Sequence, residues 1–512
     1  MSFVVTFELD EAGVVRLAEL IALKIRPGDA IALSGDLGAG KTTLARALIA
    51  ALLEDPAAEV PSPTFSLRQE YATRRLAVAH FDFYRLGSAD EAVELGLDDA
   101  LETGAAIVEW PERAPGLLPE NRFEITLVET ADAAVRRVTL RGFGTAASRA
   151  RRIGQIMAFL GGLPSWGRAR IAYLQGDAST RSYARLSGSN ATALLMDAPR
   201  QPDGPPVRDG LPYSRIAHLA EDVRPFSAIG RALRGAGLSA PEILAEDLDA
   251  GLMLIEDLGE RVYSAEVARD AGLQEELWRG AVDVLVKLRT VPVPRQLPLP
   301  DGSDYPIPSY DRAAMQIEVE LLLDWYWPAL HGERASPEVR AEFLGLWGEV
   351  FAQLQKEPPA CVLRDFHSPN LLWLPDRTGL ARVGIIDFQD AQRGSTGYDL
   401  ASLLQDARVD VPEALEVRLL DHYLRRAAQA DPAFDAEAFK FAYAALGAQR
   451  NTKILGIFVR LSRRDGKAQY LAHLPRIWRY VERNLRNPRL AGLAAWYDRY
   501  FPADTRTGAL PA

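Results

Sequence analysis

Cysteine is nearly absent from this chain of 512 residues: the sole thiol is Cys361. No disulfide can form within the chain, and a single thiol is typical of proteins from a reducing compartment. The sequence also lacks an uncharged apolar run near the roughly 20 residues that a membrane helix needs. Its first residues contain neither the basic nor the apolar region of a secretory signal. We therefore expect a cytoplasmic protein without a membrane segment.

Lysine is scarce as well, although arginine is abundant. The chain has seven lysines, and none lies between Lys41 and Lys287. The net charge of −10 argues against a general basic surface for nucleic acid, although a local patch is compatible with it. The composition, 48% hydrophobic and 25% charged, is that of an ordinary globular protein. The length suggests about three globular units.

The first motif that carries chemistry is a complete phosphate-binding loop at residues 35–42, Gly-Asp-Leu-Gly-Ala-Gly-Lys-Thr. It follows an apolar strand predicted at residues 30–33 and precedes a helix predicted at 42–53. In such a loop, backbone N–H groups face the phosphate oxygens, Lys41 reaches the β- and γ-phosphates, and the Thr42 hydroxyl ligates Mg²⁺. The predicted cofactors are therefore ATP and Mg²⁺. The residues assigned to the nucleotide here are Gly35, Gly38, Gly40, Lys41, Thr42 and Thr43.

ATP hydrolysis also needs a carboxylate near the metal and the attacking water. A predicted apolar strand at residues 105–108 ends in Glu109, which is one candidate catalytic and metal-binding residue. Asp82, near the end of a strand predicted at 77–83, is a second candidate. From the residues alone, Asp82 is equally well explained as a strand-end cap, and Trp110 as a packing residue.

Five segments occur in the order and at the spacing of one family of small ATPases: residues 35–43, 62–65, 80–86, 94–97 and 108–112. Through them, residues 1–145 resemble the TsaE family, the ATPase subunit of the bacterial machinery that makes the threonylcarbamoyl modification of adenosine 37 in tRNA. The resemblance implies an ATPase that docks on TsaB and TsaD and meets tRNA only indirectly, through that complex. It also implies that Thr64 belongs to a switch-like loop and that Trp110 lies beside the nucleotide. Asp82 and Glu109 would then serve the metal and the water.

The second motif that carries chemistry lies about 320 residues further on. Asp365 is followed by Asn370, and Asp387 ends an apolar strand. Kinases use one carboxylate to accept the proton of the acceptor hydroxyl, and an Asn and an Asp to hold Mg²⁺ on the phosphates. We therefore assign Asp365 as the catalytic residue and Asn370 and Asp387 to the metal. Asp399 is expected to support the catalytic loop, and His367 is interpreted as structural.

Around these residues the chain resembles the aminoglycoside phosphotransferase superfamily, through residues 364–370, 386–390 and 398–400. A finer pattern is similar to the AmgK family of anomeric kinases for N-acetylmuramate and N-acetylglucosamine in peptidoglycan recycling. The segments of that finer pattern are residues 176–183, 196–199, 255–259 and 449–456. The resemblance implies an amino-sugar substrate. A hinge is predicted at residues 253–259, between a small β-rich lobe and a larger helical lobe, and Glu256 and Leu258 there are assigned to the nucleotide.

One departure from the kinase pattern concerns the lysine that normally lies on the third strand of the small lobe and pairs with the α- and β-phosphates. Met196 and Asp197 stand at about its place. Either an arginine replaces this lysine or the lobe binds the triphosphate more weakly. The candidate arginines are Arg181, Arg185 and Arg224.

These observations predict an α/β P-loop NTPase domain followed by an α+β two-lobed kinase-like domain. The predicted boundaries are residues 1–145 for the first domain, 146–152 for a linker of small residues, and 153–512 for the second, with a small lobe at about 153–255 and a large lobe at about 260–500. The two halves are expected to separate near residue 147.

Alternatives for the second half remain open at this point. It could phosphorylate an aminoglycoside, choline or homoserine, or it could serve as a nucleotide-binding scaffold. An aminoglycoside pocket should be strongly acidic. A muramate pocket needs a cation for the lactyl carboxylate, and Arg450 and Lys453 are the candidates.

Overall fold

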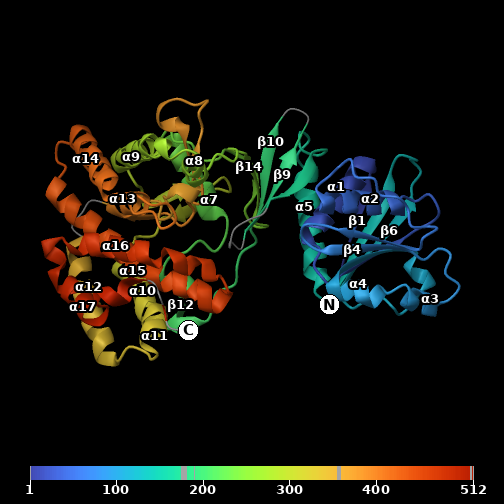
Figure 1. The fold of residues 1–512 in the computed structure, drawn as a ribbon. Helices are drawn as coiled ribbons and strands as arrows, with labels where there is room; N and C mark the ends of the chain where they lie inside the picture. The colour runs from blue at the N-terminus through green and yellow to red at the C-terminus, as the bar shows by residue number, and fades with distance from the viewer. Residues whose placement is uncertain (1, 175–180, 189–190, 355–358, 508–509, 511–512) are drawn as a thin grey trace. The chain divides into compact units, whose positions relative to one another are not determined.

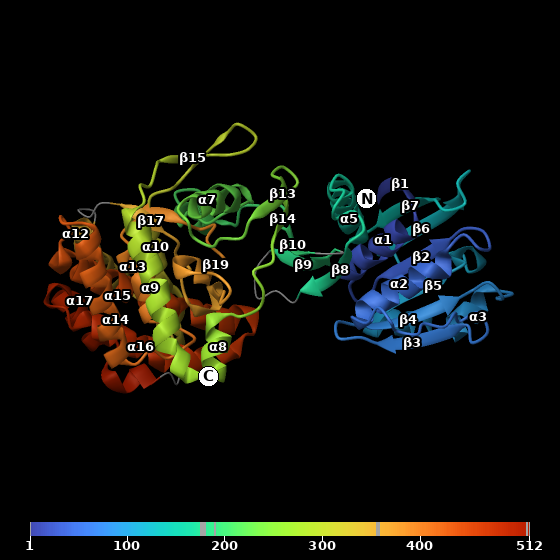
Figure 2. The same ribbon diagram turned by 90° about the horizontal axis from the view of Figure 1, so that it is seen from above.

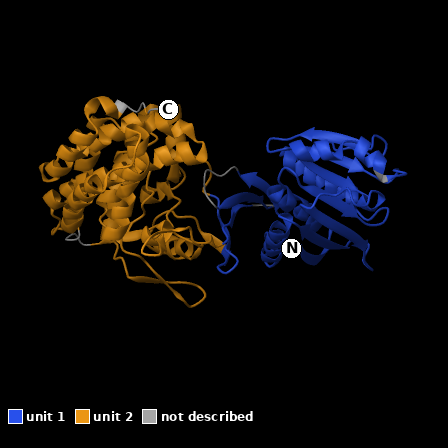
Figure 3. Cartoon of the chain, turned by 90° about the horizontal axis from the view of Figure 1, so that it is seen from below, with its two compact units in different colours: residues 1–199, 245–257 blue, residues 200–244, 258–512 orange. Residues whose placement is uncertain are grey.

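The computed structural model describes residues 2–174, 181–188, 191–354, 359–507 and 510. It divides into two compact units (Figure 3). Unit 1 comprises residues 1–199 and 245–257, and unit 2 comprises residues 200–244 and 258–512. The chain passes from unit 1 to unit 2 at residue 257, inside the predicted hinge. Unit 1 therefore contains the phosphate-binding loop together with the strands predicted for the kinase small lobe.

The first part of unit 1 is the predicted α/β domain. Its elements are β1 (Ser2–Leu9), α1 (Glu11–Lys24), β2 (Ala30–Ser34), α2 (Lys41–Leu53), β3 (Arg68–Ala72), β4 (Ala77–Asp82), α3 (Ala89–Glu94), α4 (Leu97–Thr103), β5 (Gly104–Glu109), η1 (Pro111–Arg113), β6 (Arg122–Glu129) and β7 (Arg136–Phe143). Within the described residues the strand order is β1-β7-β6-β2-β5-β4-β3 (Figure 2). The central strands β4, β5, β2 and β6 run parallel, as in other phosphate-binding-loop folds. The carboxyl ends of β2, β4 and β5 therefore lie at one edge of the sheet.

Local sequence explains why these elements form where they do. Asp10 caps α1 by accepting a hydrogen bond from Gly13 N at 2.9 Å. The elements predicted at residues 30–33, 42–53, 77–83 and 105–108 are observed with bounds shifted by one residue. Strand β3 begins only at Arg68, because the preceding residues form a turn whose Thr64 side chain bonds Asp82.

Residues 146–152, predicted as a linker, are helical. These residues form the first turns of α5 (Ala146–Gly161), which packs along β1 and β7 (Figures 1 and 2). Gly142 of β7 permits the approach, since a Cβ there would lie 2.6 Å from the Ala150 Cβ. The buried Arg149 of α5 also forms a two-pronged ion pair with Asp29. A cut near residue 147 would therefore remove a helix from this sheet.

The second part of unit 1 is a small β-sheet of the kinase-like half. Its strands are β8 (Arg170–Leu174), β9 (Ser182–Ser187), β10 (Thr192–Asp197), β13 (Ile243–Asp247) and β14 (Leu252–Glu256). The order is β13-β14-β10-β9-β8, as far as the structure describes these residues. Leu195 and Leu254 of this sheet belong to the same hydrophobic core as Leu17 and Ile153 of α1 and α5. The two parts of unit 1 are thus held together by a shared core.

Unit 2 is mainly helical. Its elements are β11 (Pro206–Arg208), β12 (Leu211–Pro212), α6 (Tyr213–Ile216), α7 (Arg224–Gly235), α8 (Tyr263–Arg269), η2 (Ala271–Leu273), α9 (Gln274–Thr290), β15 (Gln296–Pro298), β16 (Asp304–Pro306), α10 (Arg312–Leu321), the π-helical η3 (Leu322–Tyr326), α11 (Trp327–His331), α12 (Pro337–Leu354), β17 (Ala360–Val362), η4 (Ser368–Asn370), β18 (Leu371–Trp373), η5 (Gly379–Arg382), β19 (Val383–Ile385), β20 (Gln392–Gly394), α13 (Gly397–Leu404), α14 (Glu413–Ala430), α15 (Ala436–Asp465), η6 (Ala468–His473), α16 (Leu474–Leu485), η7 (Pro488–Leu490), α17 (Ala491–Tyr500) and η8 (Ala503–Thr507).

The long helix α15 crosses the middle of unit 2 and packs against α10, α13 and α16 (Figure 1). A Cβ at Gly456 would lie 2.2 Å from the Leu321 carbonyl oxygen, so only glycine permits this contact between α15 and α10. The short strands β18 and β19 pair antiparallel; β18 begins directly after Asn370, and β19 ends two residues before Asp387. Together the two units confirm the predicted fold class. In the part of the chain that the structure describes, no helix is both long and apolar enough to cross a membrane.

Candidate active sites

The phosphate-binding loop connects β2 to α2. Gly35, Gly38 and Gly40 have φ angles of 141°, 85° and 106°, a region that glycine adopts without strain. A Cβ at Gly35 would also lie 2.3 Å from the Leu127 carbonyl oxygen, so this position requires glycine on two counts. These angles give the loop the curved backbone in which successive N–H groups can bind a phosphate.

The Lys41 ammonium lies within the curve of this loop. Its Nζ donates hydrogen bonds to the carbonyl oxygens of Gly35 at 2.7 Å and Asp36 at 2.9 Å. It also lies 3.6 Å from the centre of the Trp110 ring. Burial lowers the pKa of Lys41, and the nearby Glu109 carboxylate offsets part of this effect. The structure therefore holds the predicted phosphate-binding cation against the loop, with Trp110 beside it.

The two predicted carboxylates lie on adjacent parallel strands, with Asp82 of β4 paired in register with Glu109 of β5. Glu109 Oε2 accepts a hydrogen bond from the Thr42 hydroxyl at 2.8 Å. Asp82 accepts one from the Thr64 hydroxyl at 2.8 Å and one from Tyr84 N at 3.0 Å. The structure thus brings together the residues that the sequence predicts for metal and water.

Sequence reasoning assigned no role to His80, which is fully buried behind Glu109. Its Nε2 lies 3.0 Å from Glu109 Oε1, and its Nδ1 has no hydrogen-bond partner among the described residues. Residues two apart on a strand share a face, so the position of His80 relative to Asp82 was the available signal. His80 orients the carboxylate that the Thr42 hydroxyl also contacts.

In unit 2, the catalytic motif spans the loop after β17, the turn η4 and the end of β19. The Asn370 side-chain amide donates to the Asp365 carbonyl oxygen at 3.0 Å and to Asp387 Oδ2 at 3.4 Å. Gln389 Nε2 donates to Asp387 Oδ1 at 2.7 Å. Asp387 has a φ of 60°, an unusual conformation for a residue other than glycine and one that is found at functional sites. The three predicted residues are therefore gathered at one place.

The catalytic loop is supported from beneath by Asp399, as expected. Its carboxylate accepts hydrogen bonds from Leu363 N at 2.6 Å and Arg364 N at 2.8 Å. Burial raises the pKa of Asp399 to about 7, although these two hydrogen bonds oppose the shift. Arg364 has a φ of 72°. The loop therefore has a fixed backbone conformation immediately before Asp365.

His367 lies between Asp365 and Asn370 and is buried. Its Nε2 is 3.9 Å from Asp365 Oδ1. Burial is the main cause that lowers the pKa of His367 to about 4; the charges of Asp406 and Asp365 oppose the shift, and those of Arg408 and Arg450 add to it. Its imidazole is therefore neutral near pH 7.

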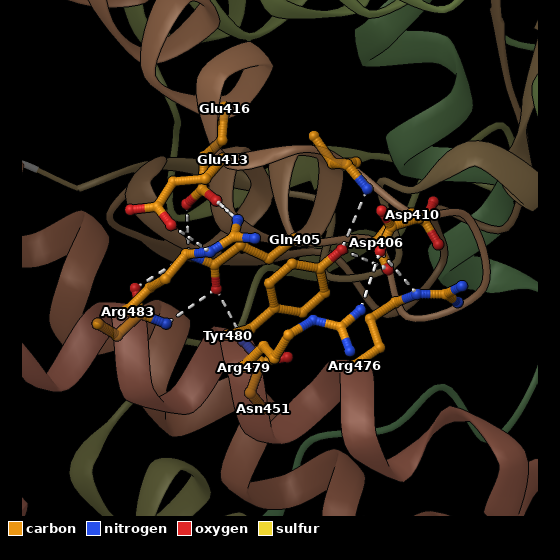
Figure 4. Close-up of polar contacts among 12 residues, drawn as sticks. Gln405, Asp406, Asp410, Glu413, Glu416, Asn451, Arg476, Arg479, Tyr480 and Arg483 are labelled. Carbon is orange, nitrogen blue, oxygen red and sulfur yellow. Dashed lines mark hydrogen bonds and ion pairs between the residues drawn. The ribbon is translucent and has the colours of Figure 1, made fainter. Parts of the chain in front are cut away.

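A second buried carboxylate, Asp406, holds Ser368 of the catalytic loop. No role followed from the sequence for Asp406. Its Oδ2 accepts hydrogen bonds from Ser368 N at 2.8 Å and from the Ser368 hydroxyl at 2.6 Å. Figure 4 shows the helical network beneath it, in which Tyr480 donates to the Asp406 carbonyl oxygen and Gln405 bonds Asn451. This network ties the catalytic loop to α15 and α16.

A third buried carboxylate, Glu318 of α10, is surrounded by donors. It accepts hydrogen bonds from Lys453 at 2.8 Å, Tyr310 at 2.6 Å and Gln449 at 2.9 Å, and it forms an ion pair with Arg364. Burial alone would raise the pKa of Glu318, but the two cations lower it to about 2. Lys453, one candidate for binding the substrate carboxylate, is therefore already paired.

The other candidate, Arg450 of α15, is buried, with 5% of its surface exposed. Its Nη1 has no hydrogen-bond partner in the described part of the chain. Its charge is one of those that lower the pKa of His367. Arg450 is therefore a buried cation with unused hydrogen-bonding capacity.

The position of the missing small-lobe lysine lies in unit 1. Asp197 accepts hydrogen bonds from Arg152 Nε at 2.7 Å and from Lys24. Met196 pairs in register with Tyr183 and points to the opposite face. Asp197 therefore serves the contact with α1 and α5.

Among the candidate replacements for that lysine, Arg185 of β9 bonds Asp257 at 2.7 Å, and Arg224 in unit 2 bonds Asp222 at 3.2 Å. Residues 175–180, which include the start of the segment 176–183 that carries the finer resemblance, lie outside the described residues. Glu256 ends β14, and Leu258 follows two residues later. Which arginine serves the phosphates, and whether Glu256 and Leu258 bind the nucleotide, stay predictions.

The folds and sites of the two parts define an ATP-using phosphotransferase joined to a P-loop ATPase. A family model described as "Phosphotransferase enzyme family" matches residues 170–439, and one described as "Threonylcarbamoyl adenosine biosynthesis protein TsaE" matches residues 9–138. The chain therefore belongs to the phosphotransferase enzyme family and carries a TsaE-family domain in its first part.

Curated relatives divide along the same line. The chain is 39% identical to the N-acetylmuramate/N-acetylglucosamine kinase of Caulobacter vibrioides, over 67% of this chain and 94% of that protein. It is 34% identical to the kinase of the same name from Pseudomonas aeruginosa, over 64% and 88%. Its first part is 38% identical to the tRNA threonylcarbamoyladenosine biosynthesis protein TsaE of Rickettsia bellii, over 22% of this chain and 76% of that protein.

Proposed function

We propose that the chain joins two ATP-dependent activities and that it works in the cytoplasm, the compartment in which tRNA is modified. The first part is the ATPase of tRNA N6-threonylcarbamoyladenosine formation at position 37. The second part phosphorylates N-acetylmuramate and N-acetylglucosamine on the anomeric oxygen. The observation that carries the second assignment is the gathered set Asp365, Asn370 and Asp387, in a chain that spans 94% of a curated kinase for these sugars.

In the second part, Asp365 accepts the proton of the anomeric hydroxyl while that oxygen attacks the γ-phosphorus of ATP. The new bond joins the sugar oxygen to phosphorus, and the bond from phosphorus to the β–γ bridging oxygen breaks to leave ADP. The amide oxygen of Asn370 and the carboxylate of Asp387 are the hard oxygen donors that Mg²⁺ prefers. These two residues would hold Mg²⁺ together with ATP, and the ion would supply positive charge to the phosphates.

Arg450 is proposed to bind the lactyl carboxylate of N-acetylmuramate. It is a buried cation whose Nη1 lacks a partner among the residues described, and it acts on His367 two positions after Asp365. A bound carboxylate would supply the hydrogen bond that Nη1 lacks. A cation at this place also disfavours an aminoglycoside, which is itself cationic.

In the first part, Lys41 and the loop N–H groups bind the phosphates. The Thr42 hydroxyl and the Glu109 carboxylate, 2.8 Å apart, are an oxygen donor pair suited to Mg²⁺. Asp82, held by Thr64, is proposed to orient the attacking water. We further propose that this part docks on TsaB and TsaD and reaches tRNA only through that complex.

A substrate panel tests the kinase assignment. The full chain is incubated with ATP, Mg²⁺ and, in turn, N-acetylmuramate, N-acetylglucosamine, kanamycin, choline or homoserine, and transfer of the γ-phosphate to the acceptor is measured. Phosphorylation of the two amino sugars supports the proposal. Phosphorylation of kanamycin, choline or homoserine alone would replace the proposed amino-sugar substrate with that acceptor. If no compound is phosphorylated, the remaining hypothesis is that the second part is a nucleotide-binding scaffold.

The variant Arg450→Ala tests the acceptor pocket. We expect KM for N-acetylmuramate to rise and KM for N-acetylglucosamine, which has no lactyl carboxylate, to stay nearly unchanged. Equal effects on both sugars would assign Arg450 to the support of the loop instead. For the first part, co-purification with TsaB and TsaD is the corresponding test of partner choice.

A further inference from the structure

A cavity of about 760 Å³ adjoins the phosphate-binding loop in unit 1. Gly40 and Thr43 of the loop and α2 line one side, Asp10 and Val14 at the start of α1 line another, and Ala133 in the turn between β6 and β7 lines a third. A volume of this size suits a small organic ligand. A nucleotide whose phosphates bind the loop would place its nucleoside in this adjoining space.

The fourth side of the cavity comes from the other half of the chain. Arg168, Ala169 and Arg170 line it. They lie at the start of β8, the first strand of the small lobe, and outside the residues 9–138 that match the TsaE family. The kinase-like half therefore contributes to the surroundings of the P-loop nucleotide.

This fourth wall is held firmly against α1. The buried Glu19 of α1 accepts a hydrogen bond from Ile171 N at 2.9 Å and forms an ion pair with Arg170. Arg168 lies 3.1 Å from Asp10, and Ala169 is buried. Arg170 is therefore held at the cavity by the buried Glu19, whereas Arg168, 82% exposed, lies at its rim in a surface ion pair with Asp10.

Arginine side chains at such a wall suit a nucleobase. A guanidinium is planar, stays charged and stacks on aromatic faces, including those of bases. We propose that the kinase small lobe completes the nucleoside pocket of the P-loop ATPase, with Arg168 and Arg170 contacting the purine. This inference rests on the proposed ATPase function of the first part. By linkage, a nucleotide in the pocket also stabilises the contact between the small lobe and α1.

The test uses the full chain and two probes, ADP and inorganic tripolyphosphate, which carries phosphates but no nucleoside. Each probe is titrated calorimetrically into the unmodified chain and into the variant Lys41→Ala. The binding that is present in the unmodified chain and lost in Lys41→Ala is assigned to the phosphate-binding loop and is called the loop component. The test variant is Arg168→Ala combined with Arg170→Lys, which keeps a cation beside Glu19 but removes the planar group. The control is Arg74→Ala, an arginine 81% exposed that pairs with Glu54 and does not line the cavity.

We expect the test variant to weaken the loop component for ADP roughly five- to thirtyfold, from the usual strength of arginine–aromatic contacts. Tripolyphosphate affinity should stay unchanged, as should both affinities of Arg74→Ala. Unchanged ADP affinity in the test variant, or an equal loss for both probes, would overturn the inference. If Lys41→Ala removes no ADP binding at all, the ATPase proposal itself fails.

Discussion

Replacing Arg149 with methionine should destabilise unit 1 strongly. Arg149 is buried on α5, and its Nη2 donates to Asp29 Oδ1 at 2.7 Å while Nη1 donates to the Lys24 carbonyl oxygen at 2.9 Å. Arg149→Met leaves the Asp29 carboxylate, 2% exposed, with one remaining backbone donor from Arg26 N. Breaking a buried ion pair on one side costs about 3–5 kcal/mol.

For a folding unit of this size, each kcal/mol shifts the melting temperature by about 2–4 °C, so the transition of unit 1 should fall by roughly 6–20 °C. Differential scanning calorimetry of the full chain measures it, and the transition of unit 2 serves as internal reference. Arg151→Met is the matched control, since Arg151 is an exposed arginine of the same helix that lies over the Phe3 ring. We expect it to cost under about 1 kcal/mol.

The double variant Asp29→Asn with Arg149→Met removes both charges and should recover part of the loss. An Arg149→Met shift no larger than that of Arg151→Met would refute the reasoning. It would mean that α5 behaves as the loose linker that the sequence predicts.

Three further predictions follow from the sites. Lys41→Ala should weaken nucleotide binding to the first part, and Glu109→Ala should reduce ATP hydrolysis more than nucleotide binding. Sugar phosphorylation should be unchanged in both variants. Loss of sugar phosphorylation in Lys41→Ala would show that the two sites are coupled. Asp365→Asn should lower the rate of sugar phosphorylation by a factor of about 10²–10⁴ with an unchanged circular dichroism spectrum. Asp387→Ala should also lose sugar phosphorylation, and excess Mg²⁺ should partly restore it. Normal turnover in either variant would remove that residue from the site. Glu318→Gln should lower the urea midpoint of unit 2 at pH 7, because the pKa of Glu318 falls from 4.5 to about 2 on folding. That stabilisation is present above pH 4.5 and is lost as the pH falls toward 2. The difference in urea midpoint between the variant and the unmodified chain should therefore shrink below pH 4.5, and a difference independent of pH would contradict the prediction.

Motifs with a fixed spacing and a strand–loop–helix context could be predicted from the sequence. The phosphate-binding loop, Asp10 as the cap of α1 and the gathering of Asp365, Asn370 and Asp387 follow from local rules. Parallel strands bring their carboxyl ends to one edge, so the neighbourhood of Asp82 and Glu109 follows as well.

Contacts between residues far apart in the chain could not be predicted in the same way. Small residues such as those at 142–148 are typical both of flexible linkers and of close helix–strand packing, and only the partner Asp29 distinguishes the two. Glu318 and Asp406 lie outside any motif, and their roles depend on neighbours up to 135 residues away, such as Lys453. The sequence alone does not distinguish a buried carboxylate from an exposed one, because its hydrogen-bond donors lie far away in the chain.

The measurement that tests the central claim most directly locates the phosphate on the product. The full chain converts N-acetylmuramate with ATP, and ³¹P–¹H correlation NMR is recorded on the purified sugar phosphate. The proposed function predicts a phosphorus signal coupled to H1, with loss of the reducing end. A signal coupled to H6 would contradict the assignment of the second part as an anomeric kinase.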